Sequence, residues 1–191
     1  VLNNLKVCDN PLQDIPRMGV LRSPIDGCTS QELAELRIQN PDGLLYETVW
    51  AYAGENEIPE KELPPYKLKS ELSNSKLGTD EMNSLNIKLK GFLSLLEKVR
   101  SMAAYTPVHE LILYVLKETG YGDYARALPG GEQRFANLTM LVEKAMDYEK
   151  TSYRGLFNFV RYIEQLQAYQ VDYGEVNLTG AGNTAVEIMT I

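Results

Sequence analysis

The sequence has 191 residues, a formal net charge of −7 and a pI of about 4.9. This length suits one domain, and the negative charge argues against strong unaided binding to nucleic acid or to an anionic membrane surface. Cys8 and Cys28 are its two cysteines and form no CxxC motif, which argues against a disulfide framework and fits a reducing, cytoplasmic compartment. No apolar run approaches the roughly 18 residues of a membrane span, so no membrane partner is expected.

The first residues predict a series of short helices. Apolar residues at a spacing of three over positions 2–8 indicate the last turns of a helix. Asn10 is expected to cap a turn that has Pro11 at its first position. Pro16 disfavours helical backbone in the residue before it, so this turn is expected to end there and a second short helix to follow. Pro24 is expected to stop that second helix.

Two further helices and an insert come next. Thr29 and Glu32 have the spacing of a capping box, in which each side chain binds the backbone N–H of the other residue, and they predict a helix start. A fourth helix is expected from Leu44 to Ala53. Residues 55–79 contain three prolines, many charged residues and few large apolar ones. They predict an exposed or partly disordered loop.

The second half of the sequence has the strongest helical periodicity. An apolar stripe at spacings of three and four predicts one long helix. Thr106 and Pro107 are expected to supply the N-cap and first position of the next helix, which Gly120 and Gly122 close, and residues 129–131 separate it from two more. The stripe of the long helix is Leu85, Leu89, Phe92, Leu96, Val99 and Ala103; the last two helices have Phe135, Leu138, Val142 and Ala145, then Leu156, Val160, Ile163 and Leu166.

The sequence ends on AVEIMTI, residues 185–191, which follows a glycine-rich turn and predicts a strand. No second strand is evident, and a lone strand with unpaired backbone groups is not stable in water. With the missing initiator methionine, this predicts a piece of a longer protein. The expected fold class is mainly α: a multi-helix domain over residues 1–184 and a stub of terminal β-strand.

Motifs that carry chemistry are scarce. His109 has no nearby nucleophile in a recognisable motif and no second histidine, so a surface or helix-cap histidine is expected. The G-x-G-x-x-A match at residues 180–185 precedes a strand instead of following one, so we interpret it as a flexible turn. Clustered acidic residues are interpreted as solvated charge. We therefore expect no catalytic, cofactor-binding or metal-binding residue in this chain.

Residues 130–166 interleave basic and aromatic side chains. Lys150, Arg154 and Arg161 are candidates for contact with DNA phosphates. The alternative is that the aromatic rings pack in the core while the basic groups pair with acidic neighbours on helix surfaces. Periodicity predicts a buried Phe157, with a cost of about 3–5 kcal/mol for Phe157→Ala. The acidic neighbours are Glu143, Glu149 and Glu164.

Four blocks of sequence resemble a known family. They are DNPLQDIPRMGVLRSPIDGCTSQELAELR (9–37), ETGYGDYARALPGGEQRFANL (118–138), YEKTSYRGLFNFVRYIE (148–164) and VEIMTI (186–191). In this colinear order they resemble the AddA family, the helicase-bearing subunits of the bacterial ATP-dependent helicase/nucleases, which belong to the UvrD-like superfamily 1 DNA helicases. The resemblance covers nearly the whole chain apart from the insert at 55–79.

The resemblance implies a segment corresponding to helical subdomain 2B, an insertion in the second RecA-like motor domain to which residues 185–191 belong. It implies a parent protein that uses ATP and magnesium to unwind duplex DNA, degrades strands and prepares double-strand breaks for recombinational repair beside a second subunit. The segment itself is expected to be non-catalytic, to contact duplex DNA and to move as a rigid body. The alternative is a protein-interaction module that docks the partner subunit or the motor domains.

The resemblance also marks architectural residues and two departures. Arg134 is expected to bridge helices through its planar guanidinium, and Asn137 to tie a loop to a helix. Arg17 and Cys28 stand where apolar or aromatic residues are expected. The full architectural set is Asn10, Asp14, Arg22, Arg134 and Asn137.

Overall fold

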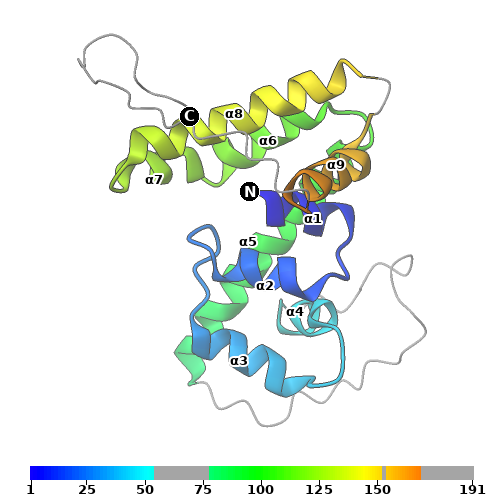
Figure 1. The fold of residues 1–191 in the computed structure, drawn as a ribbon. Helices are drawn as coiled ribbons and strands as arrows, with labels where there is room; N and C mark the ends of the chain where they lie inside the picture. The colour runs from blue at the N-terminus through cyan, green and yellow to red at the C-terminus, as the bar shows by residue number, and fades with distance from the viewer. Residues whose placement is uncertain (54–77, 152–153, 169–191) are drawn as a thin grey trace.

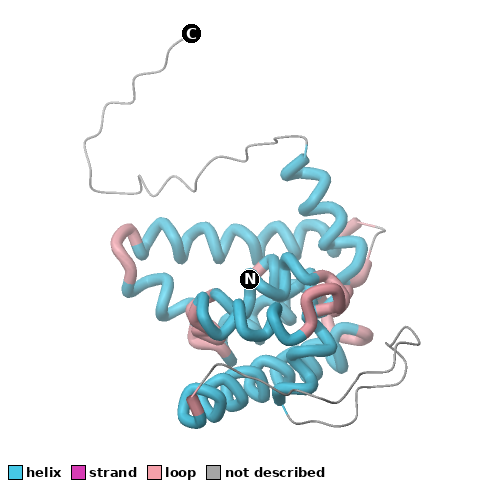
Figure 2. Tube along the Cα trace, turned by 90° about the horizontal axis from the view of Figure 1, so that it is seen from below, coloured by secondary structure: helices cyan, strands magenta, loops and turns pink. Residues whose placement is uncertain are grey.

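The computed structural model describes residues 1–53, 78–151 and 154–168, and within them it contains nine helices and no strand (Figure 2). The predicted mainly α fold is therefore confirmed. The expected strand at 185–191 and most of the expected loop at 55–79 lie outside the described residues. The helices are α1 (Leu2–Asp9), α2 (Asp14–Arg22), α3 (Ser30–Gln39), α4 (Leu45–Ala53), α5 (Thr79–Ala103), α6 (Val108–Glu118), α7 (Tyr121–Ala127), α8 (Gly131–Glu149) and α9 (Leu156–Ala168).

The turn between α1 and α2 differs from the prediction. Asn10 is the C-cap of α1, and its Oδ1 accepts a hydrogen bond from Leu12 N at 3.0 Å instead of starting a helix at Pro11. The predicted break before Pro16 is also wrong, because α2 passes through Pro16 without interruption. Pro16 lies in the first turn of α2, where backbone N–H groups have no intrahelical partner, so its missing N–H costs nothing there.

The capping box at the start of α3 is confirmed. Glu32 N donates to Thr29 Oγ1 at 3.2 Å, and Thr29 N donates to Glu32 Oε2 at 2.6 Å. These two bonds satisfy backbone donors that the helix itself leaves unpaired. The expected helix end before Pro24 is confirmed as well, since α2 ends at Arg22.

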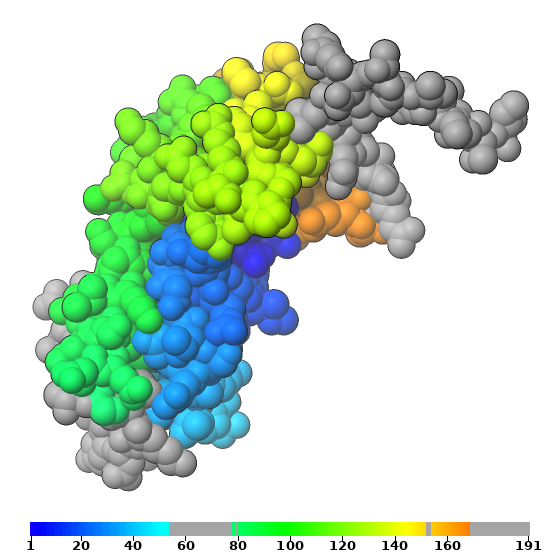
Figure 3. Space-filling view, turned by 90° about the vertical axis from the view of Figure 1, so that its left-hand side faces the viewer, coloured from blue at the N-terminus to red at the C-terminus, as the bar shows by residue number. Residues whose placement is uncertain are grey.

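The 25-residue helix α5 is the spine of the molecule (Figure 1). Its predicted apolar stripe is buried from Leu85 to Val99, whereas Ala103 is half-buried. Helices α1, α4 and α6 all pack against it. One group, α2 to α4, lies along one part of α5, and the layer of α6, α7 and α8 lies at its other end, which gives the elongated outline in Figure 3.

The interior contains one fully buried arginine. Arg17 on α2 is 0% exposed, and its guanidinium carbon lies 4.8 Å from the ring centre of Tyr46 and 5.7 Å from that of Phe92. It also donates a hydrogen bond to Pro11 O. Arg17 and Cys28 are both interior, as the family pattern of apolar or aromatic residues at these positions implies, and two aromatic faces accommodate the guanidinium charge.

The helix boundaries in the second half are set by different residues from those predicted. α6 begins at Val108, and Glu149 at the end of α8 accepts a hydrogen bond from Val108 N, so a distant carboxylate caps α6 in place of Thr106. Gly120 has a positive φ of 62° and ends α6, as expected. Gly122 instead lies inside α7.

The first and last described helices are neighbours. α1 packs against both α5 and α9 (Figure 1). Lys6 Nζ on α1 lies 3.0 Å from Glu164 Oε1 on α9. The chain therefore enters and leaves this helical unit on the same side.

Candidate functional site

The three basic residues predicted to contact DNA are exposed along one stretch of the chain. Lys150 follows α8, Arg154 precedes α9, and Arg161 lies within α9. The Lys150 side chain is 76% exposed and its Nζ lies 2.8 Å from Asp147 Oδ1. The hydrogen bond from Lys150 lowers the pKa of the Asp147 carboxyl below its ordinary value.

Phe157 is not buried, which corrects the prediction from periodicity. Its side chain is 53% exposed, whereas Phe159 is 0% exposed and packs edge-on against Tyr148 with ring centres 5.5 Å apart. The buried stripe of α9 runs through Leu156, Phe159, Val160 and Ile163. Phe157 is about 100° of helical rotation away from Leu156, so it faces outward.

The exposed Phe157 ring lies under a basic side chain. The guanidinium carbon of Arg161, four residues along α9, is 5.5 Å from the Phe157 ring centre. Residues four apart share a helix face, so the two side chains form one exposed aromatic and cationic surface. This surface combines a flat ring with a phosphate-binding group.

The acidic neighbours make other contacts than those the alternative interpretation required. Glu149 Oε2 accepts from His109 Nδ1 at 2.5 Å, and Glu164 pairs with Lys6. Among the described residues, no ion pair within 4.0 Å involves Arg154 or Arg161. Their charges remain accessible to a ligand. His109 is half-buried and ties α6 to α8, a structural contact consistent with the absence of a recognisable catalytic motif around it.

The residues marked as architectural make local and long-range contacts. Asp14 joins three elements: its Oδ1 accepts from Leu45 N at 3.0 Å and its Oδ2 lies 3.3 Å from Arg37 Nη1. Arg22 Nη1 donates to Cys28 O at 3.4 Å, across the turn that follows α2.

The other two architectural candidates lie near the start of α8. Arg134 is exposed, and its Nε donates to Pro129 O at 3.2 Å, just before its own helix. Asn137 Oδ1 accepts from Gln133 Nε2 at 3.1 Å, one turn earlier in α8. The structure thus gives both side chains local contacts within or next to α8.

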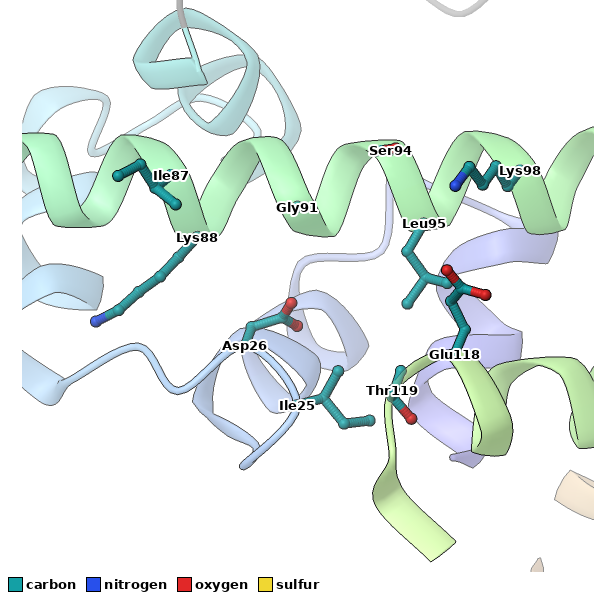
Figure 4. Close-up of a pocket in the computed structure, with 10 residues that line it drawn as sticks. All are labelled: Ile25, Asp26, Ile87, Lys88, Gly91, Ser94, Leu95, Lys98, Glu118 and Thr119. Carbon is teal, nitrogen blue, oxygen red and sulfur yellow. The ribbon is translucent and has the colours of Figure 1, made fainter. Parts of the chain in front are cut away.

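Sequence reasoning missed a pocket between α5, the turn after α2 and the end of α6 (Figure 4). Its volume is about 420 Å³, and Asp26, Gly91, Leu95 and Glu118 are among the residues that line it. Burial raises the pKa of the Asp26 carboxyl to about 7. The sequence signal was weak, because an aspartate before Gly27 is typical of an ordinary turn.

Neither a metal site nor a membrane span is found where the structure describes the chain. The described residues contain no group of three or more histidine, cysteine or acidic side chains placed to hold a metal ion. Among the described helices, none has both the length and the apolar character required to cross a bilayer. Burial raises the pKa of the Cys8 and Cys28 thiols to about 12, so neither is a reactive thiolate near neutral pH.

Comparison with known proteins identifies the sequence. No family model matches the chain. Its whole length is 38% identical to the AddA subunit of the ATP-dependent helicase/nuclease of Lachnoclostridium phytofermentans, 37% to that of Thermoanaerobacter pseudethanolicus and 40% to that of Bacillus velezensis. It covers 15%, 13% and 14% of those proteins.

The fold and these similarities define a class: a mainly helical segment of a helicase/nuclease subunit. The chain is homologous, from end to end, to one segment of the AddA subunit of ATP-dependent helicase/nucleases. The resemblance predicted from the four sequence blocks is thereby confirmed. The chain spans about one seventh of the length of these relatives.

Proposed function

We propose that the chain is a non-catalytic helical domain of a bacterial ATP-dependent DNA helicase and exonuclease that processes double-strand breaks for recombinational repair. The whole protein would act in the cytoplasm, use ATP and magnesium outside this segment, and work with a second subunit. The observation that carries the proposal is identity of 37–40% over the whole chain to proteins of that name.

We place residues 1–184 in the insertion subdomain of the second motor domain and residues 185–191 in the motor itself. The contact between α1 and α9 supports this placement, because it brings the two ends of the helical unit together. A domain with adjacent ends can be carried within a loop of another domain without distorting it. It can then swing as one body about its paired connections.

Lys150, Arg154 and Arg161 are the groups we assign to contact with the phosphates of duplex DNA. All three are exposed, and Arg154 and Arg161 are without an ion-pair partner among the described residues. Phosphate oxygens pair readily with such guanidinium groups. A local basic surface of this kind is compatible with the overall charge of −7.

The test is binding of the 191-residue chain to a fluorescent DNA duplex with one blunt end, measured by anisotropy. With three phosphate contacts, affinity is expected to fall about 40-fold when the salt concentration rises from about 50 to about 200 mM. Replacing Lys150, Arg154 and Arg161 by alanine should abolish this dependence. Lys90→Ala, an exposed lysine on α5, is the matched control and should change affinity little.

Two results would contradict the assignment. Duplex binding that keeps its salt dependence in the triple variant would place the phosphate contacts elsewhere. ATP hydrolysis or DNA cleavage by this chain, lost on substitution of one of its own residues, would contradict the non-catalytic role.

A second candidate function is a protein-interaction module that docks the partner subunit or the motor domains. The observation that favours it is the pocket on α5, whose rim carries Ile87 at 71% exposure. Large exposed apolar side chains beside a pocket are typical of protein contact surfaces. Docking of this kind would show weak salt dependence and no requirement for Arg154 or Arg161.

A further inference from the structure

The pocket on α5 contains a carboxylate without a partner. Asp26 Oδ2 is buried and has no hydrogen-bond partner among the described residues. In Figure 4 the carboxylate points toward the part of α5 that carries Gly91. A buried acceptor that is left unpaired is costly, so it requires an explanation. A ligand that donates to this oxygen supplies one.

The floor of the pocket is open because of a glycine. Gly91 lies in the interior of α5, and a Cβ at this position would meet nothing within 4 Å. Glycine weakens a helix interior, and here no neighbouring atom requires it. Its effect is to leave space beside Asp26 where a side chain would otherwise stand.

The charges around the pocket favour one added cation. Asp26 and Glu118 are the two carboxylates of the lining, and Lys88 and Lys98 are its two amines. Lys88 is already paired with Glu32 at 2.8 Å and extends away from Asp26 in Figure 4. Two carboxylates therefore face one uncommitted amine at the exposed Lys98.

The walls favour a cation on an apolar stem. Ile25 and Leu95 are half-buried parts of the lining, and Ile87 is exposed at its edge. A guanidinium is planar, weakly hydrated and able to bind a carboxylate in a partly buried site, and its three-carbon stem packs on apolar surface. These properties match the pocket better than those of a compact, strongly hydrated ammonium.

We propose that this pocket receives an arginine side chain from the surface of a partner protein. The guanidinium pairs with Asp26 over Gly91, and the stem packs against Leu95 and Ile87. This proposal goes beyond the contact with DNA and shares none of its residues, so either can fail without the other.

The experiment is a titration of the ¹⁵N-labelled chain with N-acetyl-L-arginine N-methylamide, followed by NMR. Saturable shifts are expected at the amides of Asp26, Gly91 and Leu95, with a dissociation constant in the millimolar range. The citrulline analogue, a neutral isostere, should bind at least about tenfold more weakly because it lacks the charge. Equal binding of the citrulline analogue would overturn the proposal.

Variants locate the site. Asp26→Asn removes the charge and Gly91→Met fills the open floor, and each should weaken binding at least about tenfold. Ser94→Lys adds a cation at an exposed lining position and should do the same without burying new atoms. Lys90→Met on another part of α5 is the control. Unchanged binding in Asp26→Asn or in Ser94→Lys would overturn the site.

Two further ligands test the chemistry and its source. The lysine analogue should bind more weakly than the arginine analogue, and tighter binding would contradict the assignment of a guanidinium. Free L-arginine should bind no better than the blocked form, because only the side chain enters. Free arginine binding tenfold tighter would indicate a small-molecule site and overturn the docking role.

Discussion

Lys88 on α5 holds Glu32 at the start of α3: its Nζ lies 2.8 Å from Oε1 and 2.9 Å from Oε2 of the carboxylate. Glu32 is also the acidic member of the α3 capping box. Burial by itself raises the pKa of Glu32, but hydrogen bonds from Lys88 and Thr29 hold that pKa below its ordinary value. One lysine thus fastens the N-terminus of α3 to the long helix.

Lys88→Met should lower the free energy of unfolding by about 1–3 kcal/mol near neutral pH, because it leaves a nearly buried carboxylate without its cation. A carboxyl with a lowered pKa stabilises the fold above its ordinary pKa of 4.5, and this contribution is lost as the pH falls through the folded value. The cost of Lys88→Met should therefore shrink in acid. Urea denaturation at about pH 7 and about pH 3.5 measures it, and an equal cost at both would contradict the argument.

Two phenylalanines on α9 should behave oppositely. Phe159→Ala should cost about 3–5 kcal/mol, because the ring is fully buried against Tyr148. Phe157→Ala should cost less than about 1 kcal/mol, because the ring is half exposed. Thermal and urea unfolding of the matched pair decides the matter, and a larger cost for Phe157 would reverse the assignment of the inner face.

Asp26→Asn should stabilise the protein at about pH 8 and leave its stability nearly unchanged at about pH 3.5. The raised pKa of about 7 means that the folded state resists ionisation of Asp26. The wild-type fold is therefore free of this penalty below the ordinary pKa of 3.8 and loses up to about 4 kcal/mol as the pH rises to 7. Unfolding of both proteins across this range is the measurement. A variant less stable than wild type at about pH 8 would disagree.

Arg17→Ala should cost about 2–5 kcal/mol, because it empties a fully buried site between the rings of Tyr46 and Phe92. Arg17→Met keeps much of the volume and removes the charge, so its cost should be clearly smaller. Denaturant unfolding of both variants compares them. Equal costs would show that charge, and not volume, is what the site requires.

The helices were largely predictable because their signals are local. The stripe from Leu85 to Val99 and the capping box at Thr29 depend on residues a few positions apart, and both predictions are confirmed. The error at Pro16 arose because the rule against proline applies to helix interiors, and the true helix start was misplaced. The start of α6 was shifted because a residue 41 positions away, Glu149, caps Val108.

The surface features were not predictable in the same way. A period of 3.6 cannot fix the edge of a buried face, so Phe157 and Phe159 exchanged places between expectation and structure. The pocket requires Asp26, Gly91 and Glu118 to meet, and nothing in the local sequence indicates that they do. By contrast, Lys150, Arg154 and Arg161 were candidates from charge alone, and their exposure needed the fold.

The packing of α1 between α5 and α9 governs when this domain can mature during synthesis. Leu5 and Val7 are fully enclosed in the finished structure, yet one of the walls around α1 is made some 150 residues later. At a translation rate of roughly 5–20 residues per second, the first helix waits on the order of ten seconds or more for the last. Until then its greasy side is available to chaperones, and the ribosome must release the final helix before the structure can lock.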